Sequence, residues 1–218
     1  MVPIIVQTMK KSLIQRWSDP QFVAEVGPLI RPFSLGRQLP ENADLRGIVV
    51  GLDGAWPELL HGDFIGVNLV QIDASYGRFS CSFADAKASK CMFEETIFDT
   101  CLFQKAELTQ CNFSRAKLDS PDFNDAIFRK CEFEDARITG RRIREYGGRR
   151  ISFTNCAFKN TLFQNLQFRA TTFQNCTFEG AQFRKCLLAG VKFQGGVPAK
   201  EAFQNCEVQS VTVDGNPM

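Results

Sequence analysis

The feature that most constrains this chain is a large apolar residue at every fifth position. Counted from Phe83 to Val213, this period gives 27 positions, and 17 of them hold one of the 21 phenylalanines in the sequence. A period of five fits neither an α-helix nor a straight β-strand, because both would spread the phenylalanines over different faces. So strict a period is typical of a repeat architecture, in which the chain turns the same way once per pentad and keeps each Phe inside.

The other positions of the pentad support the same interpretation. The residue two places before the large apolar residue is usually Ala or Cys, and all nine cysteines occupy this position. The three remaining positions are mostly charged or polar. Upstream, Phe64, Leu69, Ala74 and Phe79 keep the period but are one residue out of step, and Leu45 and Val50 fit as its first two sites. Each pentad therefore predicts two inward and three outward side chains.

Three segments carry a family resemblance: ENADLRG at 41–47, QKAELTQ at 104–110 and SRAKLDS at 114–120. They resemble the A(D/N)Lxx unit of the pentapeptide repeat proteins, and the resemblance covers about residues 41–213. It implies an all-β solenoid, a right-handed quadrilateral parallel β-helix with about four pentads per coil. The expected core is Phe83, Phe93, Phe98, Phe103, Phe113, Phe123, Phe128, Phe133, Phe153, Phe158, Phe163, Phe168, Phe173, Phe178, Phe183, Phe193 and Phe203.

The nine cysteines are expected to be small buried core residues rather than a metal or redox site. Zinc sites need closely spaced cysteines that converge on one point, whereas Cys81, Cys91, Cys101 and Cys111 would alternate between opposite walls of a square coil. Stacked pairs such as Cys91 and Cys111 would lie close together, but neighbouring positions on parallel strands rarely give disulfide geometry. We therefore expect reduced thiols, a cytoplasmic protein, no metal and no cofactor.

Residues 1–40 lack the repeat and are expected to form a partly helical N-terminal cap over the first coil. The spacing of Met9, Leu13 and Trp17 predicts one short helix, and a second is expected to end near Gly27 and Pro28. Residues 214–218 are expected to be a short tail that leaves the last coil open. An open edge favours pairing between copies, which predicts an end-to-end homodimer.

The segment GRRIREYGGRR at 140–150 breaks the pattern, because its inward positions would hold Arg141, Ile143, Tyr146 and Gly148. An unpaired Arg inside a coil is too unfavourable, so these residues are predicted to form an exposed loop. Net charge is −4 for residues 1–138, +8 for 139–193 and −2 for 194–218. The candidate partner-binding residues are Arg141, Arg142, Arg144, Arg149, Arg150, Lys159, Arg169, Arg184, Lys185 and Lys192. The alternative is a solvated loop with no function.

Catalysis has little support in the sequence. His61 is the sole histidine, and no phosphate-binding loop, nucleophile elbow or paired-carboxylate motif is present. No stretch is long enough to span a membrane. The preferred hypothesis is a non-catalytic module that presents its outer faces and basic loop to an acidic protein partner.

Two alternatives stay open. The first is a DNA mimic that interacts with a topoisomerase such as gyrase, as the resemblance implies for some members. Those members look strongly acidic and dimerise through a C-terminal helix, neither of which is found here. The second is direct nucleic-acid binding through residues 139–193, which salt-sensitive binding would reveal.

Overall fold

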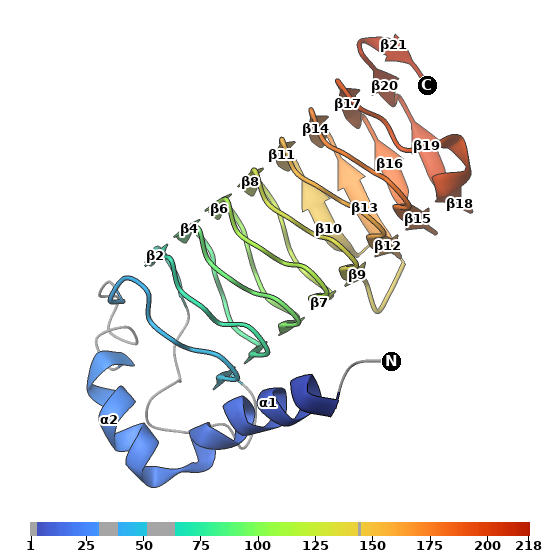
Figure 1. The fold of residues 1–218 in the computed structure, drawn as a ribbon. Helices are drawn as coiled ribbons and strands as arrows, with labels where there is room; N and C mark the ends of the chain where they lie inside the picture. The colour runs from blue at the N-terminus through green and yellow to red at the C-terminus, as the bar shows by residue number, and fades with distance from the viewer. Residues whose placement is uncertain (1–3, 31–38, 52–63, 144) are drawn as a thin grey trace.

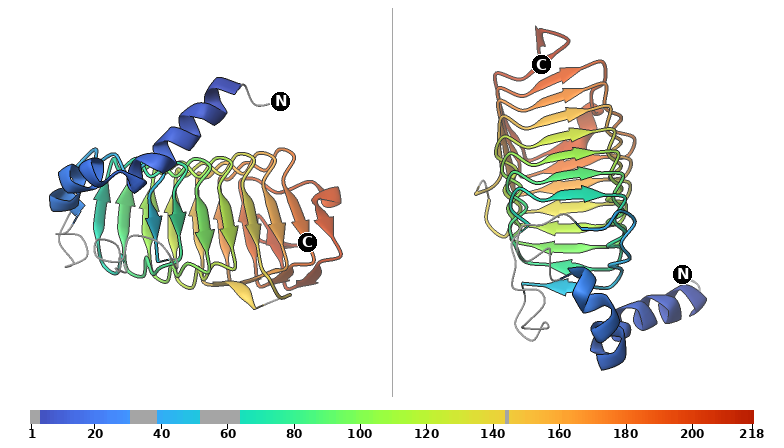
Figure 2. Two further views of the ribbon diagram at one scale, coloured as in Figure 1. Left: turned by 90° about the horizontal axis from the view of Figure 1, so that it is seen from below. Right: turned by 90° about the vertical axis from the view of Figure 1, so that its left-hand side faces the viewer.

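The computed structural model describes residues 4–30, 39–51, 64–143 and 145–218, and His61 and Arg144 lie outside these ranges. The chain forms a right-handed quadrilateral parallel β-solenoid of about seven turns with a helical segment at its N-terminal end. Figures 1 and 2 show the coils stacked along one axis, with the helices at one end and the C-terminus at the other. The fold predicted from the five-residue period is confirmed.

Each coil has four sides. The eight-strand side contains β1 (Val49–Val50), β3 (Arg78–Phe79), β5 (Ile97–Asp99), β7 (Lys117–Asp119), β9 (Arg137–Thr139), β12 (Leu162–Gln164), β15 (Gln182–Arg184) and β18 (Phe203–Gln204). The nine-strand side contains β2 (Asn68–Val70), β4 (Lys87–Ser89), β6 (Glu107–Thr109), β8 (Ile127–Arg129), β11 (Ser152–Thr154), β14 (Thr172–Gln174), β17 (Lys192–Gln194), β20 (Thr212–Val213) and β21 (Asn216–Pro217).

The other two sides are built differently. The four-strand side contains β10 (Tyr146–Arg149), β13 (Leu166–Arg169), β16 (Leu187–Ala189) and β19 (Glu207–Gln209). Before β10 this side is joined by single bridges, such as Leu102 to Asp122 and Asp122 to Gly147. The bridged side is joined by single bridges from Asp44 to Thr177.

A left-handed residue at each corner explains how the chain turns once per pentad. Among the described residues, 24 that are not glycine have φ between 46° and 64°, and most lie two places after the inward apolar residue. Lys90, Glu95, Thr100 and Lys105 illustrate the regular spacing. This conformation reverses the local handedness of the backbone, so each corner redirects the chain while the next strand stays extended.

The phenylalanines form the core along the solenoid axis. Of the 17 at the repeat sites, all are buried except Phe203, which is partly buried in the last coil. Rings on the same side of successive coils stack, as in Phe93 with Phe113 at 5.1 Å and Phe113 with Phe133 at 5.0 Å between centroids. Rings on adjacent sides meet edge to face, as in Phe123 with Phe128. Both arrangements are favourable for aromatic rings.

The cysteines lie in columns on opposite sides of the coil. Cys91, Cys111, Cys131, Cys156 and Cys176 each precede a residue of the bridged side, whereas Cys81, Cys101, Cys186 and Cys206 precede residues of the four-strand side. All nine are free thiols. Eight of them, from Cys91 to Cys206, donate to a backbone carbonyl of the preceding coil, as Cys101 Sγ does to Phe79 O at 3.2 Å.

The N-terminal cap contains α1 (Ile4–Gln15), a 3-10 turn, η1 (Arg16–Ser18), and α2 (Pro20–Ile30). Phe22, Val23 and Val26 of α2 pack against the core cluster. Helix α2 includes Pro28 and ends at Ile30, two residues beyond the end near Gly27 and Pro28 that the sequence predicted. A proline in the last turn removes one N–H donor, and the short remainder of the helix tolerates this loss.

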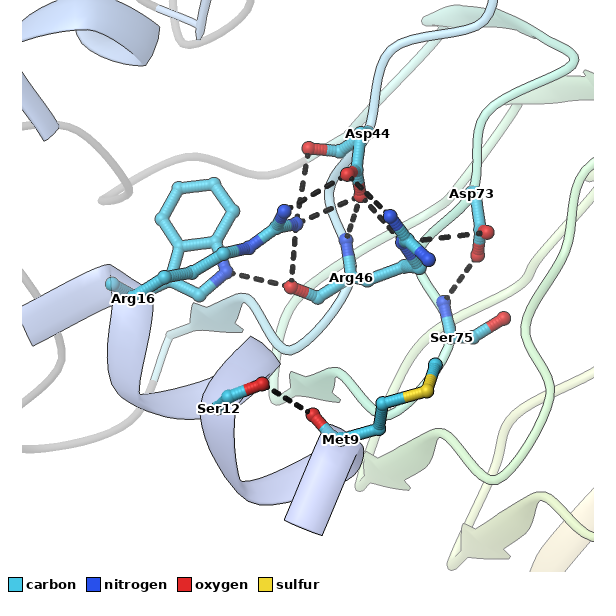
Figure 3. A network of polar contacts seen from close by, with 8 residues as sticks. Met9, Ser12, Arg16, Asp44, Arg46, Asp73 and Ser75 are labelled. Carbon is cyan, nitrogen blue, oxygen red and sulfur yellow. Dashed lines mark hydrogen bonds and ion pairs between the residues drawn. The ribbon is translucent and has the colours of Figure 1, made fainter. Parts of the chain in front are cut away.

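Asp44 ties the cap to the first coil (Figure 3). Its carboxylate accepts two bonds from Arg16, at 2.8 and 2.7 Å, and further bonds from the Arg46 side chain at 2.9 Å. The buried indole of Trp17 donates to Arg46 O at 2.8 Å. Partial burial raises the pKa of Asp44, but the hydrogen bonds from Arg16 and Arg46 outweigh this and hold it well below its usual range.

The C-terminal end is covered in part. Residues 214–218 were expected to be a tail, but β21 folds back and pairs antiparallel with β20. The Thr212–Val213 edge is therefore paired, while β18 and β19 end their sheets. An end-to-end homodimer stays a prediction.

Candidate functional site

The basic segment enters the solenoid as an insertion of five residues. Regular neighbouring coils pair residues 20 apart, as Ile97 does with Lys117. Across the segment the separation becomes 25, because Ile127 pairs with Ser152 and Arg137 with Leu162. One extra pentad therefore leaves the stack between β9 and β10 (Figure 1).

The prediction that all of residues 140–150 form a loop is wrong for its second half. Tyr146–Arg149 is strand β10, which pairs with β13, and both Gly147 and Gly148 are buried. A Cβ on Gly147 would lie 2.3 Å from Gln167 O, and one on Gly148 would lie 2.8 Å from Asn124 N. Because glycine has no Cβ, the backbone at Gly147 and Gly148 fits between the neighbouring coils. The chain can therefore rejoin the stack at β10, and a single extra pentad is enough to keep the arginine side chains outside the core.

The start of the insertion is held in place by the coil before it. Arg141 N donates to Ser120 Oγ at 3.1 Å, and Arg141 Nε donates to Asp119 Oδ2 at 3.0 Å. The guanidinium also pairs with Asp99. On the other side, Asn165 Nδ2 donates to Gly140 O at 3.0 Å. These contacts fix the base of the insertion and leave Ile143 exposed near its tip, at 54%.

Several of the ten candidate cations are already paired with acids. Arg141 pairs with Asp99 and Asp119, Arg142 with Glu145, Arg150 with Asp125 and Lys159 with Glu134. Arg150 forms two bonds to Asp125, at 2.5 and 2.7 Å, and these lower the pKa of the Asp125 carboxyl. Exposed pairs of this kind contribute little to stability, but they reduce the free positive charge of the segment.

The candidate cations do not form one patch, because they lie on different sides of the coil. Lys159 follows the bridged side, Arg184 is the last residue of β15 on the eight-strand side with Lys185 directly after it, and Lys192 lies in β17 on the nine-strand side. Arg144 lies outside the described residues.

The structure does bring together Arg149, Arg150 and Arg169, here called the arginine cluster. Arg149 and Arg169 face each other in register across β10 and β13, and Arg150 N donates to Arg169 O at 2.8 Å. All three side chains are exposed. Gln167 Oε1 accepts from Arg169 Nε at 2.9 Å and orients that guanidinium.

A pocket beside the insertion was missed by the sequence analysis. Its volume is about 190 Å³, and it is lined by Thr100, Leu102, Ser120, Asp122, Asn124, Glu145, Tyr146, Gly147, Gly148 and Gln167. Four successive coils and the end of the insertion contribute to it. The sequence did contain a signal for this pocket. Tyr146 stands where other pentads have a small inward residue such as Ala or Cys, and it directly follows the pentad whose arginines cannot be buried.

Metal and membrane sites find no support in the described ranges, 4–30, 39–51, 64–143 and 145–218. These ranges contain no group of three or more His, Cys, Asp or Glu side chains that could hold a metal ion. No helix within them is long and apolar enough to cross a membrane.

Three sequence models of pentapeptide repeats match the chain. They cover residues 81–119, described as eight copies, 103–141, described as nine copies, and 149–217, described as a pentapeptide repeat region. The chain belongs to the pentapeptide repeat family. The unmatched gap, 142–148, falls in the insertion and the start of β10, where the five-residue pattern of the pentapeptide repeat is broken.

Solved structures of the pentapeptide repeat protein QnrB1 share the fold of this chain at low sequence identity. A trypsin-treated variant of QnrB1, a plasmid-mediated fluoroquinolone resistance protein, has a TM-score of 0.60 and 16% identity, over 80% of this chain and 91% of that one. HetL, a pentapeptide repeat protein involved in heterocyst differentiation regulation from the cyanobacterium Nostoc, has a TM-score of 0.39 and 11% identity, over 88% and 99%. A search of curated proteins gave no match. The pentapeptide repeat fold is consistent with a non-catalytic protein.

Proposed function

We propose that this pentapeptide repeat protein is a non-catalytic interaction module whose arginine cluster binds an acidic surface of a partner protein. The observation that carries this proposal is the pairing of β10 with β13, which places Arg149 and Arg169 on neighbouring rungs of one exposed side. Neither forms an ion pair with an acid of the described chain, whereas Arg141, Arg150 and Lys159 do. Two guanidinium groups on neighbouring strands present donors suited to carboxylates.

The rigidity of the scaffold supports a binding role for the cluster. Arg149 is the last residue of β10 and Arg150 directly follows it, and β10 is hydrogen-bonded to the next coil. Arg149 N also donates to Asn124 Oδ1 at 2.9 Å. Side chains on fixed strands lose less conformational freedom on binding than side chains on a mobile loop. The proposed binding surface therefore contains fewer residues than the predicted basic segment 139–193. Arg184, Lys185 and Lys192 of that segment lie on other sides of the coil.

The test is affinity capture from the native cell with the wild type and with the double variant Arg149→Glu/Arg169→Glu. The matched control is Arg184→Glu/Lys185→Glu, which changes the same charge on the eight-strand side. We expect a specific protein to be retained by the wild type and by the control, and to be lost from the double variant. Equal capture by all three proteins would refute the role of the arginine cluster.

Nucleic-acid binding is the alternative that the same cations allow. Phosphate contacts would give an affinity that falls steeply with salt, whatever the sequence of the nucleic acid. Mobility shifts with duplex DNA and with RNA at low and physiological salt separate the two functions. A shift that the double variant abolishes would favour nucleic acid over an acidic protein.

Mimicry of DNA toward a topoisomerase has less support. A mimic needs a continuous acidic surface, but Asp99, Asp119, Asp125, Glu94 and Glu134 are engaged by arginine or lysine side chains of neighbouring coils. A gyrase supercoiling assay tests this alternative directly, and inhibition or protection at micromolar protein would restore it.

A further inference from the structure

We infer that the pocket beside the insertion binds one cationic side chain, an arginine or lysine of a partner protein. The pocket combines two carboxylates, Asp122 and Glu145, with the ring of Tyr146 and the partly exposed side chain of Leu102. The inference rests on this lining and not on the arginine cluster, whose residues do not line the pocket.

The charge of the lining selects a cation. Among the described residues that line the pocket there is no Lys or Arg, so its formal charge comes from Asp122 and Glu145 alone. A carboxylate or phosphate group would meet two like charges there, whereas a guanidinium or ammonium group would meet two opposite ones.

The hydrogen bonds that these carboxylates already make leave room for a ligand. Asp122 Oδ1 accepts from Asn124 N at 2.9 Å, and Oδ2 accepts from Gln104 Nε2 at 2.7 Å. Glu145 Oε1 lies 3.4 Å from Arg142 Nη1, a long contact on an exposed side chain. Each carboxylate oxygen has two lone pairs, so Asp122 can hold its present partners and still accept from a cation.

The apolar part of the lining suits the stem of a basic side chain. Leu102 is 38% exposed, and Tyr146 is partly exposed beside it. Long basic side chains bury their methylene groups against such surfaces while the charged end contacts carboxylates or an aromatic face. A volume of about 190 Å³ fits one side chain and is smaller than the pockets that bind most cofactors and drug-sized ligands.

The position of the pocket favours a protein partner as the source of this side chain. The insertion beside it exposes Ile143, and the arginine cluster lies on the same side of the solenoid. An anchor pocket surrounded by apolar and polar groups is the usual arrangement at the centre of a protein interface.

The experiment is a titration of the full chain, labelled with ¹⁵N, with N-acetyl-arginine methylamide. The matched neutral probe is N-acetyl-citrulline methylamide, which has nearly the same shape without the charge. We expect saturable shifts of the Tyr146, Gly147 and Gly148 amides with the arginine probe, with a dissociation constant on the order of 1 mM. Absence of saturable shifts at these amides, or equal binding of the citrulline probe, would overturn the inference.

Variants locate the site. Asp122→Asn and Glu145→Gln should each weaken the arginine probe by about fivefold or more, because each removes one opposite charge. Glu145 is exposed on the insertion, so its replacement leaves the fold intact even where Asp122→Asn does not. Glu132→Gln is the control, since Glu132 occupies the equivalent outward position on the bridged side. Weakening by Glu132→Gln equal to that by Glu145→Gln would contradict the site.

Both outcomes can be separated from the proposed function. Loss of capture by the Arg149→Glu/Arg169→Glu variant does not depend on the pocket, and binding of the arginine probe does not depend on the arginine cluster. Probe binding that the Arg149→Glu/Arg169→Glu variant leaves unchanged would support two separate contacts on one side of the solenoid.

Discussion

At the scale of single residues, the corners of the solenoid impose a conformation that most of their side chains disfavour. Asparagine, which tolerates left-handed backbone, occupies corners 155, 160, 165, 175 and 205. Other corners hold Lys, Glu, Gln, Thr or Arg, for which this conformation is unfavourable by about 1–2 kcal/mol each. Burial of the stacked phenylalanines must offset the strain at the corners, so the square shape of the coil depends on the columns of Phe side chains in the core.

The exposed corner at Ala170 tests this relation, because its φ of 48° is left-handed and its side chain makes no compensating bond. Ala170→Gly should stabilise the protein by about 0.5–1 kcal/mol, because relief of strain exceeds the added freedom of the unfolded chain. Urea unfolding measures the change. The neighbouring Ala189 has ordinary strand geometry, so Ala189→Gly should instead destabilise by about 0.5–1 kcal/mol. A loss of stability in both variants would show that the corner is not strained.

The inward phenylalanines could be predicted from the period alone, because a five-residue repeat has one solution that keeps them all inside. The corner conformation could not be predicted in the same way. Its position is outward and carries almost any polar residue, so no single residue type marks it. Only the recurrence of Asn and Gly after residue 150, as at Asn155, Gly180 and Gly190, carries a signal.

At the scale of elements, the stability of the contact between the cap and the first coil should depend on pH through the ionisation of Asp44. Because its folded pKa is depressed, the stability it contributes is fully present above the unfolded value of about 4 and is lost as the pH falls toward the folded pKa. The indole N–H resonance of Trp17, which reports the bond to Arg46 O, should shift as the pH is lowered through this range.

Asp44→Asn should remove this dependence and lower the free energy of unfolding near neutral pH by about 1 kcal/mol, since Asp44 is partly exposed to solvent. Glu25→Gln, an exposed change in α2, is the control and should leave both properties unchanged. If the Asp44→Asn variant kept the wild-type pH profile, Asp44 would be excluded as the titrating group.

The insertion gives a sharper prediction at the same scale. Deletion of residues 141–145 should leave a folded solenoid, because the strand pairings that span the insertion would then have the regular separation of 20 residues. The loss of stability should be small, because the contacts of Arg141 with Asp99 and Asp119 that the deletion removes are exposed to solvent. Circular dichroism and urea unfolding measure it.

A deletion of equal length inside a regular coil is the control. Removal of residues 121–125 takes away one side of the square together with the buried Phe123, so that protein should fail to form a continuous stack. Comparable stability of the two deletions would refute the assignment of 141–145 as the extra pentad.

The sequence could not identify which pentad leaves the stack, because the count of five runs through the insertion without a break. The sequence correctly indicated that Arg141 cannot be buried, but the prediction placed Tyr146 and Gly148 in the same loop. The deciding contacts are the approaches of Gly147 to Gln167 and Gly148 to Asn124, which involve the next and previous coils. Distances between coils are not readable from a local pattern, and the pocket beside Tyr146 follows from the same contacts.

At the scale of the whole molecule, charge is balanced between coils rather than along the sequence. Arg141 in the basic segment neutralises Asp99 and Asp119, and Arg150 neutralises Asp125. The sequence is acidic before residue 139 and basic after it, but these ion pairs make the contrast in charge weaker on the surface of the folded protein. Ion pairing and the distribution of the cations over four sides explain why a basic segment of 55 residues gathers only three arginines, one of them paired with Asp125, and why the site could not be placed from charge counts.

The nine thiols provide a test of how the solenoid opens as a whole. Cys81 and Cys206 are partly exposed, whereas the other seven are buried in the stacked core. A hydrogen bond from Cys186 lowers the pKa of Cys206 to about 7, which outweighs the effect of its partial burial and increases its thiolate fraction near neutral pH. A thiol reagent such as DTNB should therefore label two cysteines rapidly in the native protein, with the rate at Cys206 rising through about pH 7 and then levelling off.

The seven buried cysteines should react only as fast as the core opens, and together if the stack opens cooperatively. The double variant Cys81→Ala/Cys206→Ala is the control and should lose the rapid phase while keeping the slow one. Mass spectrometry of partly labelled protein separates the two modes of opening. Early labelling of Cys186 ahead of Cys131 would show that the solenoid frays from its C-terminal coils, so that these coils are held less firmly than the middle coils, where Cys131 lies.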